Sequence, residues 1–200
     1  MSHDNHMRIY YDAELPTRTG LTAGSPRWLH LERFIDACAA ENLITVLEVG
    51  SGAGHDGILL GAAGLGYTGV DLSAVGTELC RGQGLQAVQA SATALPFKDG
   101  SFDAVWTMST LMHLPGERME DALREIRRVM RPAGLLEVGV WGADTDGVRI
   151  DDRDRYFRQR TDRRLKELVS DIGRLVAFET WDYLPGGGHY QWAQVRVNAS

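Results

Sequence analysis

A glycine-rich segment between an apolar run and a helical run constrains this chain more than any other feature. The apolar run covers residues 44–49 and leads into Gly50-Ser51-Gly52-Ala53-Gly54. Glycines between a strand and a helix permit a tight turn and let the backbone approach a ligand closely. A second apolar run then ends at Asp71, at the distance where nucleotide-binding folds place the acid that binds a ribose. The pattern predicts a strand–loop–helix–strand unit, with Asp71 accepting hydrogen bonds from both ribose hydroxyls.

The rest of the chain continues this alternation of short apolar runs and amphipathic segments. Such alternation predicts a parallel sheet flanked by helices. We expect helices to begin at Ser25, His55, Ser73, Glu117 and Thr161, and strands at 44–49, 67–71, 85–89, 102–106 and 135–140, followed by a terminal hairpin of 175–182 and 189–197 around Gly186, Gly187 and Gly188. No repeat or linker divides the sequence, so residues 1–200 are expected to form one domain, with 1–24 as an N-terminal segment.

Composition narrows the setting of the protein. The chain has 200 residues, of which 44% are hydrophobic, enough for a full core without staples. Cys38 and Cys80 both fall in predicted helices, so we expect buried, reduced thiols and a cytoplasmic location. The polar start, Met1 to Arg8, lacks the apolar region of a signal peptide and is expected to be partly disordered, and no run is long enough to cross a membrane. The net charge of −6 argues against a nucleic-acid partner.

The charge around the glycine loop discriminates between cofactors. Dinucleotide sites use G-x-G-x-x-G with a pyrophosphate at the helix N-terminus. This chain has G-x-G-x-G, and His55 stands where the third glycine of that pattern would fall. Glu48 lies just before the loop, where an anion hinders a pyrophosphate and helps a cation. S-adenosylmethionine (SAM) carries a sulfonium and an ammonium but no phosphate, so the loop favours SAM over a nicotinamide dinucleotide.

Four segments in order resemble the motifs of the class I SAM-dependent methyltransferases. They are VLEVGSGAG at 46–54, GVDLS at 69–73, ALPF with DGSFDAV between 94 and 105, and REIRRVMRPAG at 124–134. The resemblance covers roughly residues 44–141 and is closest to the group of small methyltransferases that includes many small-molecule enzymes. It implies a Rossmann-like α/β fold with a seven-stranded sheet in the order 3-2-1-4-5-7-6, in which strand 7 is antiparallel.

The resemblance also implies roles for individual residues. Glu48, Gly50, Ser51 and Gly52 would surround the methionine part of SAM, His55 would help to close the pocket, Asp71 would hold the ribose, Leu72 and Ala92 would contact the adenine, and Thr107 would lie beside the amino-acid part. One position departs from the family. Ser91 stands where an Asp usually accepts a hydrogen bond from the adenine amino group. A hydroxyl still accepts, but it is shorter and neutral, which predicts weaker SAM binding or a bridging water.

Candidates for acceptor chemistry are few. His113 follows the fourth predicted strand, and the sequence leaves it open whether it is a general base or a structural, substrate-orienting residue. Tyr11 is a candidate for a lid over the site, although packing explains it equally well. The mixed-charge segment 144–160 is read first as a solvated loop, with the alternative of a substrate lid using Tyr156, Phe157 and one arginine. Its aspartates do not follow a calcium-loop spacing, so no metal is expected.

The preferred prediction is transfer of a methyl group from SAM to an O, N or C atom of a small metabolite. Two alternatives remain open: a methyltransferase acting on tRNA or protein, and a protein that binds SAM without turnover. A nicotinamide dehydrogenase is disfavoured by Glu48 and His55. The acceptor, the pathway and the oligomeric state cannot be read from the sequence, because this fold hosts many chemistries.

Overall fold

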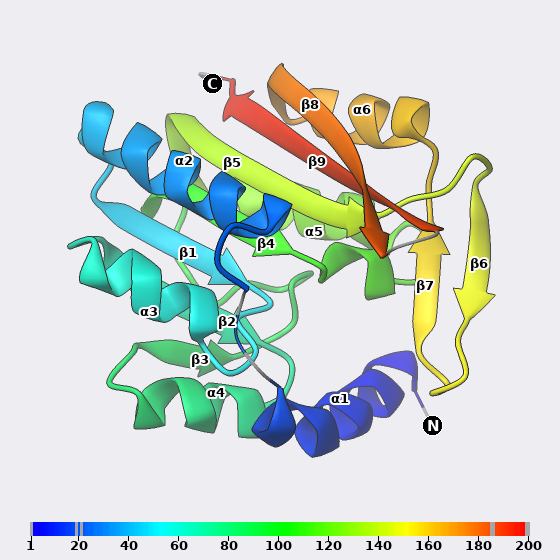
Figure 1. Cartoon of the computed structure of the whole chain (residues 1–200). Coiled ribbons are helices and arrows are strands. Elements are labelled where there is room, and N and C mark those ends of the chain that lie inside the picture. The colour runs from blue at the N-terminus through cyan, green and yellow to red at the C-terminus, as the bar shows by residue number, and fades with distance from the viewer. Residues whose placement is uncertain (1, 19, 21, 185–186, 199–200) are drawn as a thin grey trace.

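The computed structural model describes residues 2–18, 20, 22–184 and 187–198. Its centre is a seven-stranded sheet in the order β3-β2-β1-β4-β5-β9-β8 (Figure 1). The strands are β1 (Thr45–Val49), β2 (Gly66–Asp71), β3 (Ala87–Gln89), β4 (Phe102–Met108), β5 (Met130–Trp141), β8 (Gly173–Leu184) and β9 (Gly187–Val197). β9 pairs antiparallel with β5 and β8, while β1 to β5 run parallel. Counted within the sheet alone, this is the expected order 3-2-1-4-5-7-6. Gly186, expected in the turn of the terminal hairpin, lies outside the described residues.

Helices cover both faces of the sheet and divide the core into two clusters. Side chains of α2 (Pro26–Ala40), α3 (His55–Ala62) and α4 (Ala74–Gly82) pack with Val46 and Trp106. Side chains of α5 (Arg118–Val129) and α6 (Asp162–Ser170) pack with Leu47 and Val105. Neighbouring residues of a strand point to opposite faces, so Val46 and Leu47 enter different clusters. The mixed α/β class predicted from the sequence is therefore confirmed.

The predicted caps explain where the helices begin. The Ser25 hydroxyl accepts from the backbone N–H of Trp28, and the Ser73 hydroxyl accepts from that of Gly76. Each cap satisfies one of the N–H groups that a helix start leaves without a partner. The next strand begins earlier than expected, because α5 ends at Val129 and β5 starts at Met130 rather than at residue 135.

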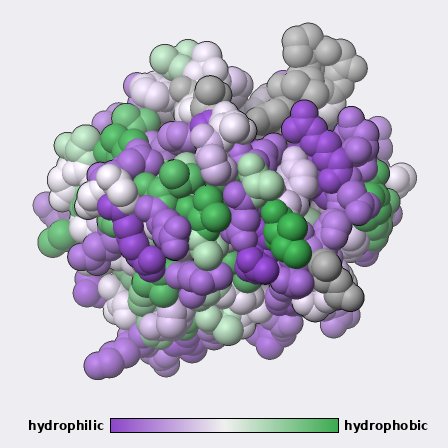
Figure 2. Space-filling view, turned by 90° about the horizontal axis from the view of Figure 1, so that it is seen from below, coloured by the Kyte–Doolittle hydropathy of each residue, from purple (hydrophilic) through white to green (hydrophobic). Residues whose placement is uncertain are grey.

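The structure of the N-terminal segment differs from the one predicted from the sequence. Residues expected to form a partly disordered polar tail instead form α1 (His3–Glu14), which continues into the 3-10 turn η1 (Leu15–Thr17). Ser2 caps α1, and Met7 and Leu15 are buried. Figure 1 shows α1 lying across the lower end of the molecule. Seen from that side, the surface is mostly hydrophilic with smaller hydrophobic patches (Figure 2), as expected for an amphipathic helix that turns its few apolar residues inward.

The segment 144–160, read first as a solvated loop, is also corrected. It contains an antiparallel hairpin of β6 (Gly147–Ile150) and β7 (Tyr156–Gln159). The Asp151 carboxylate accepts from the backbone N–H groups of Arg153 and Arg155, which stabilises the turn. Phe157 is buried against the rest of the protein. One buried aromatic side chain thus anchors a segment whose many charges suggested a loop.

No helix within the described part of the chain combines the length and the apolar character needed to cross a bilayer.

Candidate cofactor and acceptor site

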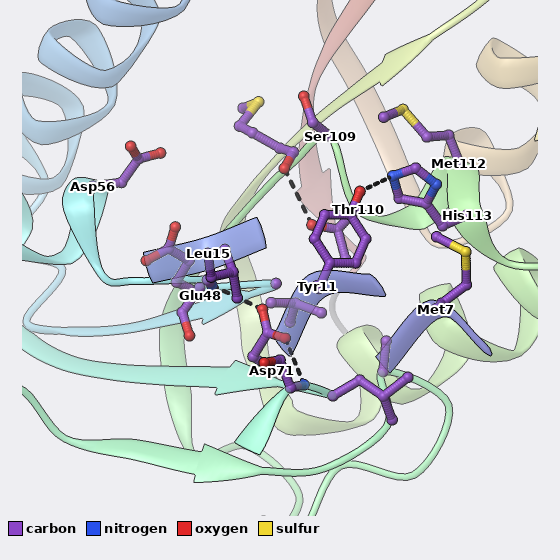
Figure 3. Close-up of a pocket in the computed structure, with 18 of the residues that line it drawn as sticks. Met7, Tyr11, Leu15, Glu48, Asp56, Asp71, Ser109, Thr110, Met112 and His113 are labelled. Atoms are coloured by element: carbon purple, nitrogen blue, oxygen red, sulfur yellow. Dashed lines mark hydrogen bonds between the residues drawn. The ribbon is translucent and has the colours of Figure 1, made fainter. Parts of the chain in front are cut away.

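A cavity of about 610 Å³ lies where β1, β2 and β4 end, beneath α1. Its volume falls within the range of small-molecule sites, roughly 300–1,000 Å³. Residues from the glycine loop, the end of β2 and the segment after β4 line it, together with residues of α1 and β7. Figure 3 shows Glu48 and Asp71 apart from His113 and Met112, with Tyr11 between them. Most of the residues predicted for cofactor and for acceptor therefore share one cavity.

The glycine loop has the backbone geometry that its sequence suggested. Gly50, Gly52 and Gly54 have φ values of 85°, 51° and 83°, in a backbone region that residues other than glycine rarely adopt. A Cβ on Gly50 would lie 1.9 Å from the hydroxyl oxygen of Thr110. The loop therefore brings bare backbone to the cavity wall. Only glycine permits this approach at Gly50.

Asp71 closes the other side of the loop. One carboxylate oxygen accepts from the backbone N–H of Gly52 and the other from that of Ser73, both at 2.8 Å. Burial raises the pKa of Asp71, while these two hydrogen bonds oppose the shift. Each carboxylate oxygen has two lone pairs, so each keeps one for a ligand. The carboxylate is thus positioned to accept from two neighbouring hydroxyls.

Glu48 lies beneath the cavity among buried polar groups. It is only 3% exposed, and the Tyr67 hydroxyl donates to its Oε2 at 2.5 Å. Burial raises the pKa of Glu48 well above its usual range, and the nearby carboxylate of Asp56 acts in the same direction. Asp56 itself accepts from Arg27 and from the indole N–H of Trp106. The buried carboxyl of Glu48 is therefore favoured as an anion only where positive charge is close by, and Arg27 supplies part of that charge.

The remaining cofactor candidates, apart from Thr107, lie at the wall of the cavity. Ser51, His55, Leu72, Ser91 and Ala92 line the cavity with the glycine loop. The Ser91 hydroxyl forms a hydrogen bond with that of Thr93 at 2.9 Å.

Thr107 is the exception among these candidates. It is fully buried within β4, where its hydroxyl donates to the backbone carbonyl of Val49 at 2.9 Å and ties β4 to β1. Met108, Ser109 and Thr110 line the cavity in its place. The prediction missed this because strand β4 continues two residues beyond the expected end at Trp106.

His113 uses both ring nitrogens in hydrogen bonds within the protein. Nδ1 lies 2.8 Å from the backbone carbonyl of Tyr156, which can only accept, so Nδ1 carries the proton. The Tyr11 hydroxyl then donates to Nε2 at 2.7 Å (Figure 3). Burial lowers the pKa of His113 to about 4, and the charges of Arg155 and Arg18 add to this effect. His113 is therefore neutral at pH 7, and its lone pair is engaged.

Two arginines line the cavity together with His113 and Phe157, and we call this part of the cavity the acceptor side. The guanidinium carbon of Arg18 lies 5.6 Å from the ring centre of Tyr11, and that of Arg155 lies 5.1 Å from the ring centre of Phe157. Phe157 also packs on the ring of His113, at 4.7 Å between centres. Tyr156 contributes only its backbone carbonyl, which accepts from His113, and it is not among the residues that line the cavity.

The sequence reading missed most of the contribution of α1. Met7 and Tyr11 of α1 and Leu15 of η1 all line the cavity and recur at helical spacing, so they form one stripe. That spacing was visible in the sequence. It was overlooked because polar residues dominate the segment. Among the described residues, no group of three or more His, Cys, Asp or Glu side chains could hold a metal ion.

Comparison with known proteins accounts for this arrangement. Residues 47–138 match a family described as "Methyltransferase domain", and the match includes the glycine loop, Asp71 and His113. Residues 47–138, just under half of the chain, therefore form a methyltransferase domain. The predictions of the family and of SAM as its cofactor are therefore confirmed.

Relatives of this methyltransferase act on different kinds of molecule. The tRNA (carboxymethyluridine(34)-5-O)-methyltransferase ALKBH8 of Mus musculus is 29% identical over 70% of this chain and 20% of that protein. Phthiotriol/phenolphthiotriol dimycocerosates methyltransferase 1 of Mycobacterium ulcerans is 31% identical over 71% of this chain and 63% of that protein. The chain thus spans 20% of the length of the first relative and 63% of the length of the second, less than two thirds in both cases.

A solved structure shows the same fold over the whole chain. It is the 1,6-didemethyltoxoflavin-N1-methyltransferase of Burkholderia thailandensis, with 1,6-didemethyltoxoflavin and S-adenosylhomocysteine bound. The two structures superpose with a TM-score of 0.73 at 20% identity, covering 100% of this methyltransferase and 92% of that chain.

The residues of the cavity fit the cofactor of the family. The Gly50 backbone lies bare at the cavity wall, where a Cβ would collide with Thr110. Asp71 keeps free lone pairs for ribose hydroxyls, and the buried carboxyl of Glu48 becomes favourable as an anion once a cation is near.

Proposed function

We propose that this methyltransferase transfers a methyl group from SAM to an atom of a small molecule bound in the same cavity. The observation that carries the proposal is that the cofactor loop and the His113 region open into one cavity of about 610 Å³ under α1. A volume in the small-molecule range, roofed by a helix, suits a small acceptor better than a polynucleotide.

Three contacts hold α1 over this cavity, which supports its role as a lid. The ring of His3 donates to the backbone carbonyl of His113, and Asp4 pairs with Arg118. At the other end, the Ser73 hydroxyl donates to Asp12 at 2.5 Å. The helix is thereby attached both near Asp71 and near His113.

The cofactor roles are proposals drawn from this geometry. Gly50, Ser51 and Gly52 would receive the amino-acid part, with Glu48 as the anion beneath it. Asp71 would accept from the ribose hydroxyls, and Leu72, Ser91 and Ala92 would contact the adenine. His55 would close the pocket from α3. When bound, SAM supplies an electrophilic methyl group on its sulfonium, and the protein supplies alignment.

Of the two roles left open for His113, we propose the orienting one. Its Nε2 accepts from Tyr11, and its Nδ1–H is held by the Tyr156 carbonyl. A general base needs a free lone pair and a pKa close to the working pH. His113 has neither, so it would fix the Tyr11 hydroxyl at the cavity wall.

The test uses SAM labelled in its methyl group. The protein is incubated with either the small-molecule fraction or the total tRNA of a cell extract, and the label is followed in each. We expect calorimetry to show SAM and S-adenosylhomocysteine binding, and label to enter the small-molecule fraction. Label in tRNA alone would support the alternative suggested by the mouse relative. Binding of SAM with no transfer to either fraction would support a non-catalytic role, and binding of NAD without SAM would contradict the cofactor assignment.

A further inference from the structure

We propose that the methyl acceptor is an oxyanion on a flat apolar body, either a carboxylate or an ionised phenol or enol, held by Arg18 and Arg155. This inference rests on the proposed methyl transfer and specifies its substrate class. It starts from the absence of a usable base among the described residues at the acceptor side, and from the charge of the groups that face that side.

A neutral hydroxyl acceptor would need a group that takes its proton. His113 is the histidine nearest to Tyr11, and both of its nitrogens are already bonded. A relay through Tyr11 would leave a proton on His113, which is buried beside Arg18 and Arg155. Their positive charges oppose that protonation. An acceptor that arrives as an anion avoids this step.

The cations at this end face the cavity, while their acidic partners do not line it. Arg18 and Arg155 both line the cavity. Arg155 pairs with Asp151, and Arg18 forms a looser ion pair with Glu14, with 3.7 Å between its Nε and a carboxylate oxygen. Neither Asp151 nor Glu14 is among the lining residues. An acceptor in this part of the cavity therefore meets positive charge first.

The other charged groups of α1 that line the cavity do not cancel that charge. Asp4 is engaged by two hydrogen bonds from Arg118, and Arg8 is engaged by Asp12 and Asn5. Arg155 bonds to Asp151 through Nε and one terminal nitrogen, so its donors for an acceptor oxygen are those of its other terminal nitrogen, beside those of Arg18. A planar guanidinium binds a carboxylate through two parallel hydrogen bonds, which suits an oxyanion.

Aromatic rings define the shape of the body that carries this oxyanion. Phe157 and Trp141 both line the cavity, with ring centres 5.9 Å apart and planes inclined by 38°. Tyr11 of α1 lines the same cavity. Rings of this kind favour flat apolar groups, which stack on them or meet their edges.

The transfer balances without a proton. The acceptor oxygen forms a bond to the methyl carbon, the carbon–sulfur bond breaks, and its electron pair stays on sulfur. The negative acceptor and the positive sulfonium both become neutral. A neutral amine acceptor would instead leave a cation between two arginines, which their charges disfavour.

The test compares three probes of one shape and different charge: 2-naphthoate, 2-naphthamide and the cation 2-naphthylmethylammonium. Calorimetry is run at neutral pH with saturating S-adenosylhomocysteine. Because hydrogen bonds to a charged group are worth about 1.5–3 kcal/mol, and each 1.4 kcal/mol is a factor of ten, naphthoate should bind at least ~10-fold tighter than the amide. Arg18→Gln and Arg155→Gln should remove that advantage and leave amide binding unchanged.

Two variants control for folding. Arg163→Gln removes an exposed arginine of α6 that bonds to Glu167, and it should bind all probes as the wild type does. Arg155→Lys keeps the charge and should retain part of the preference for naphthoate. Equal or tighter binding of the amide or the cation overturns the proposal, and so does failure of all three probes to bind. Failure of S-adenosylhomocysteine to bind would contradict the proposed function instead.

Discussion

Gly50 offers the sharpest test of how the cofactor loop is built. Its φ of 85° costs an L-residue about 1–2 kcal/mol. A Cβ there would also lie 1.9 Å from the Thr110 hydroxyl oxygen and 2.6 Å from the Thr110 Cβ, so the change of a side-chain rotamer cannot relieve the overlap. Overpacking of this kind costs about 1–3 kcal/mol more. Gly50→Ala should therefore lose about 2–5 kcal/mol of unfolding free energy.

Gly64 supplies a matched control. Its φ is also 85°, but a Cβ on it would have no heavy atom within 4 Å. Gly64→Ala should show the backbone strain alone, about 1–2 kcal/mol. In a protein of this size, 1 kcal/mol shifts the melting temperature by roughly 2–4 °C. The difference between the two variants isolates the overlap with Thr110.

Urea unfolding measures the free energy of unfolding of each variant. Calorimetry measures the affinity of each variant for S-adenosylhomocysteine, which reports on the cofactor loop. Thr110 must shift to admit the new methyl group, so Gly50→Ala should also weaken cofactor binding, whereas Gly64→Ala should not. Equal destabilisation of the two variants, with unchanged binding in Gly50→Ala, would refute the close approach of loop and Thr110.

Three further predictions follow from other groups. Asp71→Ala should weaken SAM binding by about 1.5–3 kcal/mol in calorimetry, while Asp99→Ala, far more exposed, should not; equal affinities would remove Asp71 as the ribose ligand. The pKa of His113 is lowered to about 4, so the unfolded chain binds a proton that the folded chain does not, and the stability present above pH 6.5 is lost as the pH falls toward 4. Between pH 7 and pH 5 this amounts to about 2 kcal/mol, which His113→Gln should abolish in urea titrations; an unchanged pH slope would contradict the assignment. Burial raises the pKa of Cys38 to about 12, and Cys80 is equally buried, so neither thiol should react with a disulfide reagent before unfolding.

The sheet and the cofactor loop were predictable because local pattern and tertiary packing agree there. Residues 44–49 are mostly apolar, and β1 is buried on both faces, so the run that the sequence displays is the strand that the fold uses. The sequence predicts Ser73 as a helix N-cap, and its hydroxyl accepts from the backbone N–H of Gly76. The glycines were read as a tight loop and have positive φ. Each of these signals is contained within a few neighbouring residues.

The missed features depend on contacts between distant segments. α1 is polar, and Met7 is buried because the helix lies along a cavity wall that segments far away in sequence form. The hairpin of β6 and β7 is stabilised by Phe157 packing on His113, far away in sequence. The ring of His113 looked available because the sequence could not show Tyr11 bonded to it. Partners across the chain, rather than propensities, decide these positions.

The attachment of α1 at both ends has a kinetic consequence. Asp12 holds the helix beside Asp71, and His3 holds it beside His113. Movement of the helix would therefore uncover the cofactor side and the acceptor side of the cavity together. Lid opening on the microsecond-to-millisecond scale limits turnover in many enzymes. We expect the two products to be released in one event, with a single slow phase governed by the Asp12–Ser73 and His3–His113 contacts.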